Sequence, residues 1–200
     1  MTSARGPVGG IVLTGGGAVR LDGADKAGVE VGGRTLLEHA LDVLTAADEV
    51  VVVGPEVDTS RPVTFRREDP PGGGPAAGVL AGLAGFVRRP RLVVVLAVDM
   101  PLVTTGTVER LLRAATGDGA TLVDPSGRQQ YLCAAYTVDA LERQRAAIGG
   151  GAGGGTGEHG LPMRRLVAGL DLVEVVATGS EAQDVDTWAD LRRVRETGGC

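Results

Sequence analysis

The sequence predicts an α/β protein, a three-layer α/β/α sandwich on a Rossmann-like, mostly parallel mixed sheet. Three observations lead to this expectation. Short, continuous, valine-rich runs alternate along the chain with stretches whose apolar residues recur at helical spacing. Glycine clusters and prolines separate these segments, as they do at turns and loops. The chain has 200 residues, a length typical of one domain, so we expect a single domain over residues 1–200.

Each apolar run is an expected strand and each periodic stretch an expected helix. The strands are expected at residues 9–14, 49–54, 91–99, 120–124, 131–136 and 170–176. The helices are expected at residues 35–47, 75–87, 104–115, 139–147, 162–169 and 187–196. Alternating strands and helices indicate parallel strands joined by right-handed crossovers. The close strand pair on either side of the turn "PSGR" interrupts this alternation, which makes the expected sheet mixed.

Composition and charge exclude several classes of protein. The net charge is -5 and the charges are scattered, so we expect no binding to nucleic acid. No run reaches the roughly 18 apolar residues of a membrane span, and the first residues lack the apolar core of a signal peptide. We therefore expect a cytoplasmic protein that does not bind membranes. Cys133 and Cys200 form neither a disulfide framework nor a metal cluster, and Cys133 is expected to be simply buried.

The glycines at residues 15–17 follow the first expected strand, and Asp99 is the last residue of the third. Ligands of open α/β sheets bind beyond the carboxyl ends of the strands, so both features should lie on one rim. The loop does not match a P-loop, because Lys26 follows Asp25 and precedes Ala27. It also fits the dinucleotide fingerprint poorly, because Arg20 stands where the third glycine belongs.

A third kind of phosphate loop combines glycine amides with two cations. Residues 13–26 resemble the signature L-A-G-G-x-x-x-R-M-G-x-x-D-K of the MobA-like NTP transferases. The differences are Thr14 for alanine, Leu21 for methionine and Asp22 for glycine, the last of which puts a negative charge near the phosphates. Five further segments resemble family segments in the same order: "GRTLLEHALDVL", "GGGPAAGVLAGL", "VVVLAVDMPLV", "GRQQYLCAAY" and "DVDTWADL".

This resemblance implies a sheet of the nucleotide-diphospho-sugar transferase type and a nucleotidyl transfer reaction. A phosphate of the acceptor attacks the α-phosphorus of a nucleoside triphosphate, and pyrophosphate leaves. The acceptor phosphate is already an anion at neutral pH, so the reaction requires no general base. It requires positioning and charge neutralisation, for which Mg²⁺ with carboxylate and phosphate ligands is the implied cofactor.

The resemblance assigns Lys26, Arg20 and Asp99 to catalysis, and Asp99 and Asp186 to the metal. Asp99 ends a long apolar strand, where an isolated carboxylate is costly without a cation, although it could instead cap a turn or helix. Asp186 could instead cap the last helix, as could Thr187. The expected nucleotide-binding residues are Leu13, Thr14, Gly15, Gly16, Gly17, Arg20, Lys26, Asp69, Pro75, Gly78 and Asp99. Arg128 and Gln130 are expected to bind the acceptor, or else to be ordinary polar residues of a hairpin turn.

Within the family, Gly16 and the segment "GPAAG" resemble guanylyl rather than cytidylyl enzymes, which implies GTP as the donor. The acceptor implied is molybdopterin, with molybdoenzymes or cofactor-assembly proteins as possible partners. Three alternatives stay open: CTP or another phosphorylated acceptor, a non-catalytic nucleotide-binding assembly protein, and a Rossmann oxidoreductase.

The remaining polar features have plainer interpretations. Residues 149–160 are glycine-rich and are expected to form a linker between helices rather than a lid. His39 and His159 have no partner at metal-binding spacing. Arg164 and Arg165 are expected on a solvated face rather than at the acceptor. Asp25 is expected to orient Lys26 or Arg20.

Overall fold

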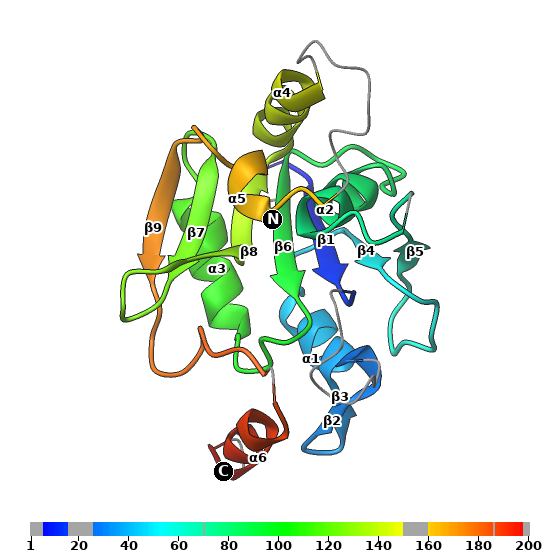
Figure 1. Cartoon of the computed structure of the whole chain (residues 1–200), viewed down its shortest axis with the longest axis vertical. Coiled ribbons are helices and arrows are strands. Elements are labelled where there is room, and N and C mark those ends of the chain that lie inside the picture. The colour runs from blue at the N-terminus through cyan, green and yellow to red at the C-terminus, as the bar shows by residue number, and fades with distance from the viewer. Residues whose placement is uncertain (1–5, 16–25, 70, 150–159, 186, 198–200) are drawn as a thin grey trace.

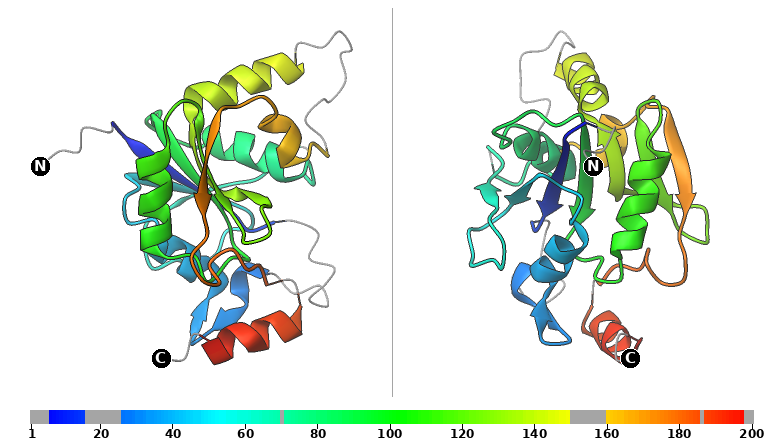
Figure 2. Two further views of the ribbon diagram at one scale, coloured as in Figure 1. Left: turned by 90° about the vertical axis from the view of Figure 1, so that its left-hand side faces the viewer. Right: turned by 180° about the vertical axis from the view of Figure 1, so that it is seen from behind.

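A computed structural model describes residues 6–15, 26–69, 71–149, 160–185 and 187–197. Helices cover both faces of a central sheet (Figure 1), and the view along the sheet edge separates the three layers (Figure 2). The predicted fold class is therefore confirmed.

The sheet contains seven strands in the described part of the chain. Five of them follow in the order β5-β4-β1-β6-β8, and β7 pairs with β9. Only the pairing of β6 with β8 is antiparallel among these ladders. The strands are β1 (Val8–Leu13), β4 (Glu49–Val53), β5 (Thr64–Arg66), β6 (Leu92–Ala97), β7 (Gly119–Val123), β8 (Gln129–Thr137) and β9 (Leu172–Val176).

β7 and β8 are the arms of a hairpin, so the β7–β9 pair continues the sheet beside β8 (Figure 1). The hairpin closes where the Asp124 amide donates to the Arg128 carbonyl at 3.0 Å. Gly119 starts β7 with φ of 152°, and a Cβ there would lie 2.3 Å from the Ala135 carbonyl oxygen on β8. Only glycine allows this close approach of the two backbones.

Six helices occur in the described residues: α1 (Leu36–Val43), α2 (Pro75–Leu83), α3 (Thr105–Ala114), α4 (Val138–Gly149), α5 (Met163–Leu166) and α6 (Trp188–Thr197). The apolar side chains of α1, α3 and α6 belong to the core on one face of the sheet. Those of α2, α4 and α5 belong to the core on the other face. Every residue of β1 is buried, which explains why this strand has a continuous apolar run rather than an alternating pattern.

Some elements differ from the sequence-based expectation at their ends. α1 ends at Val43 rather than residue 47, and α2 ends at Leu83 rather than residue 87. Three very short strands had no counterpart in the prediction: β5 and the hairpin of β2 (Glu30–Val31) and β3 (Arg34–Thr35). A turn of 3-10 helix, η2 (Lys26–Gly28), precedes this hairpin. Residues 150–159, within the expected linker, lie outside the described residues.

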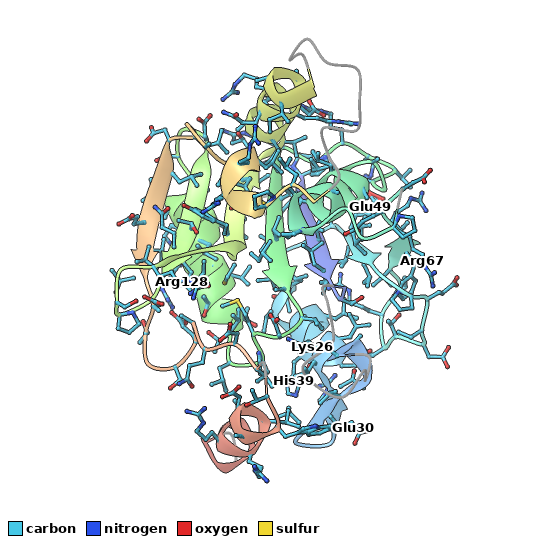
Figure 3. All side chains as sticks on the ribbon, viewed as in Figure 1. Lys26, Glu30, His39, Glu49, Arg67 and Arg128 are labelled. Carbon is cyan, nitrogen blue, oxygen red and sulfur yellow. The ribbon has the colours of Figure 1, made fainter. Side chains whose placement is uncertain are left out.

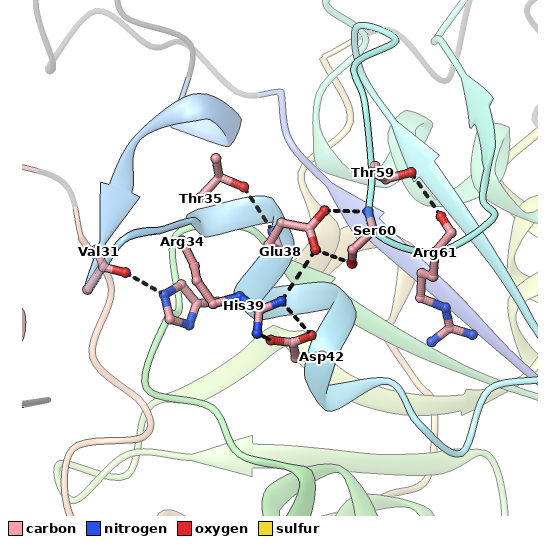
Figure 4. A network of polar contacts seen from close by, with 9 residues as sticks. All are labelled: Val31, Arg34, Thr35, Glu38, His39, Asp42, Thr59, Ser60 and Arg61. Atoms are coloured by element: carbon pink, nitrogen blue, oxygen red, sulfur yellow. Dashed lines mark hydrogen bonds and ion pairs between the residues drawn. The ribbon is translucent and has the colours of Figure 1, made fainter. Parts of the chain in front are cut away.

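The edge strand β5 is held in place by contacts of the preceding loop with α1 (Figure 4). Glu38 accepts from the Ser60 amide at 2.9 Å and from the Ser60 hydroxyl. Arg61 donates to the Leu44 carbonyl at the end of α1, at 3.1 Å. Thr35 caps the start of α1 by accepting from the Glu38 amide at 3.1 Å. The rim residues on either side of this loop are thereby anchored to the body of the sheet.

Four residues that the sequence analysis kept out of the site have ordinary structural surroundings. Cys133 is fully buried, and burial raises the pKa of its thiol to about 12. The His39 ring lies 2.9 Å from the Val31 carbonyl oxygen. Arg164 and Arg165 are exposed on α5. Among the described residues, no helix has the length and apolar character needed to cross a lipid bilayer.

Candidate active site

A cavity of about 520 Å³ opens at the carboxyl ends of β1, β4, β5 and β6. Its walls come from the residues that follow these strands, from the loop before α2, and from single residues of η2 and β8. The lining residues are Leu13, Thr14, Gly15, Lys26, Val53, Gly54, Pro55, Arg67, Glu68, Pro71, Gly72, Gly74, Pro75, Ala97, Val98, Asp99 and Leu132. This position is where open α/β sheets bind ligands.

Lys26 and Asp99 meet on the wall of this cavity although 73 residues separate them in the chain. The Lys26 ammonium donates to Asp99 Oδ2 at 3.2 Å, and the two side chains are 10% and 26% exposed. η2 carries Lys26, which is labelled below the strand ends in Figure 3. Because charged groups are costly to bury alone, the ion pair gives each of these largely buried groups a partner of opposite charge at the cavity.

Backbone hydrogen bonds hold Asp99 from two sides. The Val98 amide donates to the Leu13 carbonyl at 3.0 Å, which joins the end of β6 to the end of β1. The Val185 amide donates to the Asp99 carbonyl at 2.8 Å, so the segment before α6 runs beside Asp99. The main chain at Asp99 is therefore joined to the end of β1 and to the segment before α6, both distant from it in sequence.

Thr14, which replaces the family's alanine, has a specific place in the structure. Its amide and its hydroxyl both lie within hydrogen-bond distance of the Val53 carbonyl, at 3.1 and 3.2 Å. A Cβ at Gly54 would lie 1.8 Å from the Thr14 hydroxyl oxygen. Thr14 and Gly54 thus fit one another, and the hydroxyl fastens the end of β1 to the end of β4.

The wall before α2 is organised by Glu68. Its carboxylate accepts from the Gly73 amide at 2.9 Å. A Cβ on Gly78 would lie 3.0 Å from the other carboxylate oxygen and 3.2 Å from a methyl group of Leu13. Gly78 therefore lies behind the cavity wall and leaves room for Glu68 and Leu13, while Pro75 at the start of α2 lines the cavity itself.

The expected nucleotide-binding residues fall into three groups in the structure. Those that line the cavity are Leu13, Thr14, Gly15, Lys26, Pro75 and Asp99. Gly78 lies behind the wall, and Asp69 is exposed and does not line it. Gly16, Gly17 and Arg20 lie outside the described residues, as do Asp22, Asp25, His159, Asp186 and Cys200.

Arg128 and Gln130 lie in the β7–β8 hairpin and do not line the described cavity. The Gln130 side-chain amide is 3.5 Å from Asp124 Oδ2. Asp124 organises the turn, since its carboxylate accepts from the Ser126 hydroxyl at 2.6 Å and from the Arg128 amide at 2.9 Å. The Ser126 hydroxyl and then the Arg128 amide lower the pKa of Asp124 below its ordinary value. An acceptor role for Arg128 and Gln130 stays a prediction.

Thr187, which the sequence offered as the other candidate to cap the last helix, caps the start of α6. Thr187 accepts from the Asp190 amide at 3.2 Å, and Asp190 accepts from the Thr187 amide at 2.9 Å. This reciprocal pair is a capping box at the start of α6.

Sequence reasoning missed several residues of the cavity, chiefly Gly54, Pro55, Arg67, Glu68 and Leu132. Gly54 and Pro55 stand at the carboxyl end of an expected strand, and this position could have indicated that they lie on the rim where ligands bind. Arg67 and Glu68 follow β5, which the sequence did not reveal. Leu132 reaches the cavity because β8 continues past β6, whose last pairing is between Leu96 and Cys133.

Asp99 is the residue best placed to hold a divalent cation. The described residues contain no group of three or more histidine, cysteine, aspartate or glutamate side chains that could hold a metal by themselves. Mg²⁺ is commonly bound by one or two carboxylates together with substrate phosphates and water. Asp99, on a cavity that also contains Lys26, fits this mode of binding, whereas the Glu68 carboxylate on the same cavity accepts from the Gly73 amide.

The chain is similar to known proteins over most of its length. The family model described as the MobA-like NTP transferase domain matches residues 10–170. A probable molybdenum cofactor guanylyltransferase of Mycobacterium tuberculosis (strain ATCC 25618 / H37Rv) is 37% identical over 200 residues, covering 96% of this chain and 95% of the relative.

Two solved structures are similar in fold. One is the molybdopterin-guanine dinucleotide biosynthesis protein A from Archaeoglobus fulgidus, with a TM-score of 0.68 and 23% identity over 95% of this chain and 98% of that one. The other is the 2-C-methyl-D-erythritol 4-phosphate cytidylyltransferase from Thermus thermophilus, with a TM-score of 0.66 and 23% identity over the same shares of the chains. At these identities the likeness shows the fold alone, which guanine- and cytosine-related proteins share.

Proposed function

Because the chain belongs to the MobA-like NTP transferase family, we propose that it transfers GMP from GTP to the phosphate of a molybdopterin-type acceptor and releases pyrophosphate. The relative that is 37% identical over nearly the whole chain is named a molybdenum cofactor guanylyltransferase. The structural observation that supports the proposal is the meeting of Lys26 and Asp99, 3.2 Å apart, on a cavity at the strand ends.

In this reaction an oxygen of the acceptor phosphate forms a bond to the α-phosphorus of GTP. The bond from that phosphorus to the oxygen bridging the α- and β-phosphates breaks, and the electron pair leaves with pyrophosphate. The attacking oxygen is already negatively charged, so the chain does not need to remove a proton. Catalysis then depends on positioning and on charge neutralisation.

The residues of the cavity divide this work. Asp99 would hold Mg²⁺, which when bound supplies positive charge to the phosphate oxygens. Lys26 would exchange its contact with Asp99 for one with the phosphates and stabilise the charge that develops on the leaving pyrophosphate. The backbone at Gly15, where no side chain intervenes, allows the phosphates to approach the end of β1 closely. In this proposal the product then passes to a molybdoenzyme or a cofactor-assembly protein in the cytoplasm.

The test is pyrophosphate release with Mg²⁺, molybdopterin and each of GTP, CTP, ATP and UTP. We expect turnover with GTP that Asp99→Asn abolishes. Asp58→Asn is the matched control, since Asp58 is exposed in the β4–β5 loop and does not line the cavity. GTP binding without turnover would indicate a non-catalytic assembly protein, and preferential use of CTP would overturn the choice of base. Retention of NAD(H) without dependence on Mg²⁺ would indicate an oxidoreductase.

A further inference from the structure

The strand order places the residues of the cavity along a line. Backbone hydrogen bonds cross the rim from Gly54 to the Arg66 carbonyl, from Thr14 to the Val53 carbonyl and from Val98 to the Leu13 carbonyl, at 2.9, 3.1 and 3.0 Å. They connect the ends of β5, β4, β1 and β6 in that order. Because neighbouring strands are about 4.8 Å apart, the end of β5 is about 14 Å from the end of β6.

Opposite ends of this line carry different chemistry. The end near β1 and β6 has Gly15, Lys26 and Asp99, the groups suited to phosphates and a divalent cation. The end near β4 and β5 has Gly54 and Arg67. A nucleoside triphosphate whose phosphates lie at the first end therefore extends its base toward the second. This orientation rests on the proposed function.

Arg67 does not pair with a carboxylate among the described residues, unlike several other arginines of the chain. Arg89, Arg110 and Arg143 form ion pairs with neighbouring carboxylates. Within the described ranges, the exposed Arg67 has no hydrogen-bond or ion-pair partner, although the acidic Glu68 is adjacent in sequence. Glu68 instead accepts from the Gly73 amide, and this contact anchors the segment that carries Arg67 at the rim. In Figure 3, Arg67 lies beside β5 and away from Lys26.

We propose that Arg67 selects the base of the nucleotide by donating to O6 and N7 of guanine. A guanidinium offers only donors, arranged as a fork that matches two adjacent acceptors. Guanine presents O6 and N7 on one edge, and arginine binds this pair in a bidentate manner. Adenine has an amino donor in place of O6, and the pyrimidines have no N7, so each of them satisfies the fork less well.

The test uses Arg67→Met, which keeps most of the apolar stem and removes the fork. We expect kcat/KM for GTP to fall about 10- to 100-fold, the range for loss of a bidentate contact between arginine and guanine. The matched control is Arg66→Met, because Arg66 is also exposed but donates to the Phe65 carbonyl and does not line the cavity. This control should keep wild-type kinetics.

A second substrate identifies the contact. 7-Deaza-GTP has a C–H group in place of N7, so the wild-type chain should use it less well than GTP, and Arg67→Met should lose less with it than with GTP. Equal losses with both nucleotides would place Arg67 on the ribose or phosphates and overturn the proposal. An Arg67→Met variant with wild-type kinetics, or an Arg66→Met variant with the same loss, would overturn it as well.

Equilibrium binding of GTP and ATP with Mg²⁺, measured by calorimetry, separates this proposal from the proposed function. If molybdopterin is not guanylylated but Arg67→Met still reduces the preference for GTP over ATP, the proposed reaction fails and base selection by Arg67 stands. If GTP is turned over normally by Arg67→Met, the reaction stands and base selection by Arg67 fails.

Discussion

Two acidic residues near the same rim of the sheet, Asp99 and Glu181, are each paired with a cation, but in different surroundings. The Asp99 side chain is 26% exposed and faces a cavity of about 520 Å³ with Lys26. Glu181 is 5% exposed, and its carboxylate accepts from the Thr107 hydroxyl, the Arg110 guanidinium and the Thr178 amide. Glu181 borders a smaller hollow of about 360 Å³, but these three donors occupy both of its oxygens.

The difference separates a carboxylate available to a ligand from one that joins parts of the fold. Glu181 connects the first turn of α3 to the segment after β9, through Thr107 and Thr178. Burial acts to raise the pKa of Glu181, but the hydrogen bonds from Thr107, Thr178 and Arg110 outweigh it and hold the pKa below its ordinary value. Removing Asp99 should therefore affect mainly activity, and removing Glu181 mainly stability.

The largest expected effect is that of Asp99→Asn on turnover. Loss of the carboxylate removes the metal ligand, so kcat with GTP should fall about 1,000-fold or more, equivalent to several kcal/mol of transition-state stabilisation. The measurement is pyrophosphate release, with chemical denaturation in parallel. A variant that keeps turnover within tenfold of wild type would show that Asp99 is not the metal ligand.

Glu181→Ala should be the most destabilising change in the comparison. It leaves the partly exposed Arg110 and the buried Thr107 without their acceptor, and leaving such donors unsatisfied costs about 1–3 kcal/mol. Urea denaturation gives the loss directly. Glu181→Gln keeps an acceptor oxygen and should lose less. If Asp99→Asn lowered the free energy of unfolding more than Glu181→Ala, the assignment of Asp99 to activity and of Glu181 to stability would be wrong.

Lys26→Met should reduce kcat/KM for GTP by about 100-fold, the usual effect of losing one group that stabilises developing charge. Arg34→Met is a suitable control, since Arg34, on β3, is half exposed, pairs with Asp42 of α1 and does not line the cavity. An effect on the free energy of unfolding without an effect on turnover would make the Lys26–Asp99 pair a structural contact like that of Glu181.

The same comparison shows what the sequence could reveal. β1, β4 and β6 were predictable because parallel strands that are buried on both faces have continuous apolar runs. Their order of appearance implied that Gly15 and Asp99 share a rim, and the structure places both on one cavity. β5 has three residues and no periodicity, so Arg67 and Glu68 could not be assigned to the rim. The role of Glu181 depends on contacts across 71 and 74 residues, for which the sequence has no local signal.

The smallest expected effect concerns the acid dependence of the Glu181 contacts. A carboxylate whose folded pKa is lowered stabilises the fold at any pH above its ordinary value of 4.5, and this contribution is lost as the pH falls through the folded pKa. Other carboxylates with lowered pKa values, such as Asp118, act in the same direction, so wild type alone is not informative. The difference in the free energy of unfolding between wild type and Glu181→Gln isolates residue 181, because glutamine does not titrate. This difference should be constant above pH 6 or so and should shrink below about pH 4.5, as both side chains become uncharged. A difference that grew on acidification would mean that the three donors fail to hold Glu181 ionised, and the contrast with Asp99 would then have to be drawn on exposure alone.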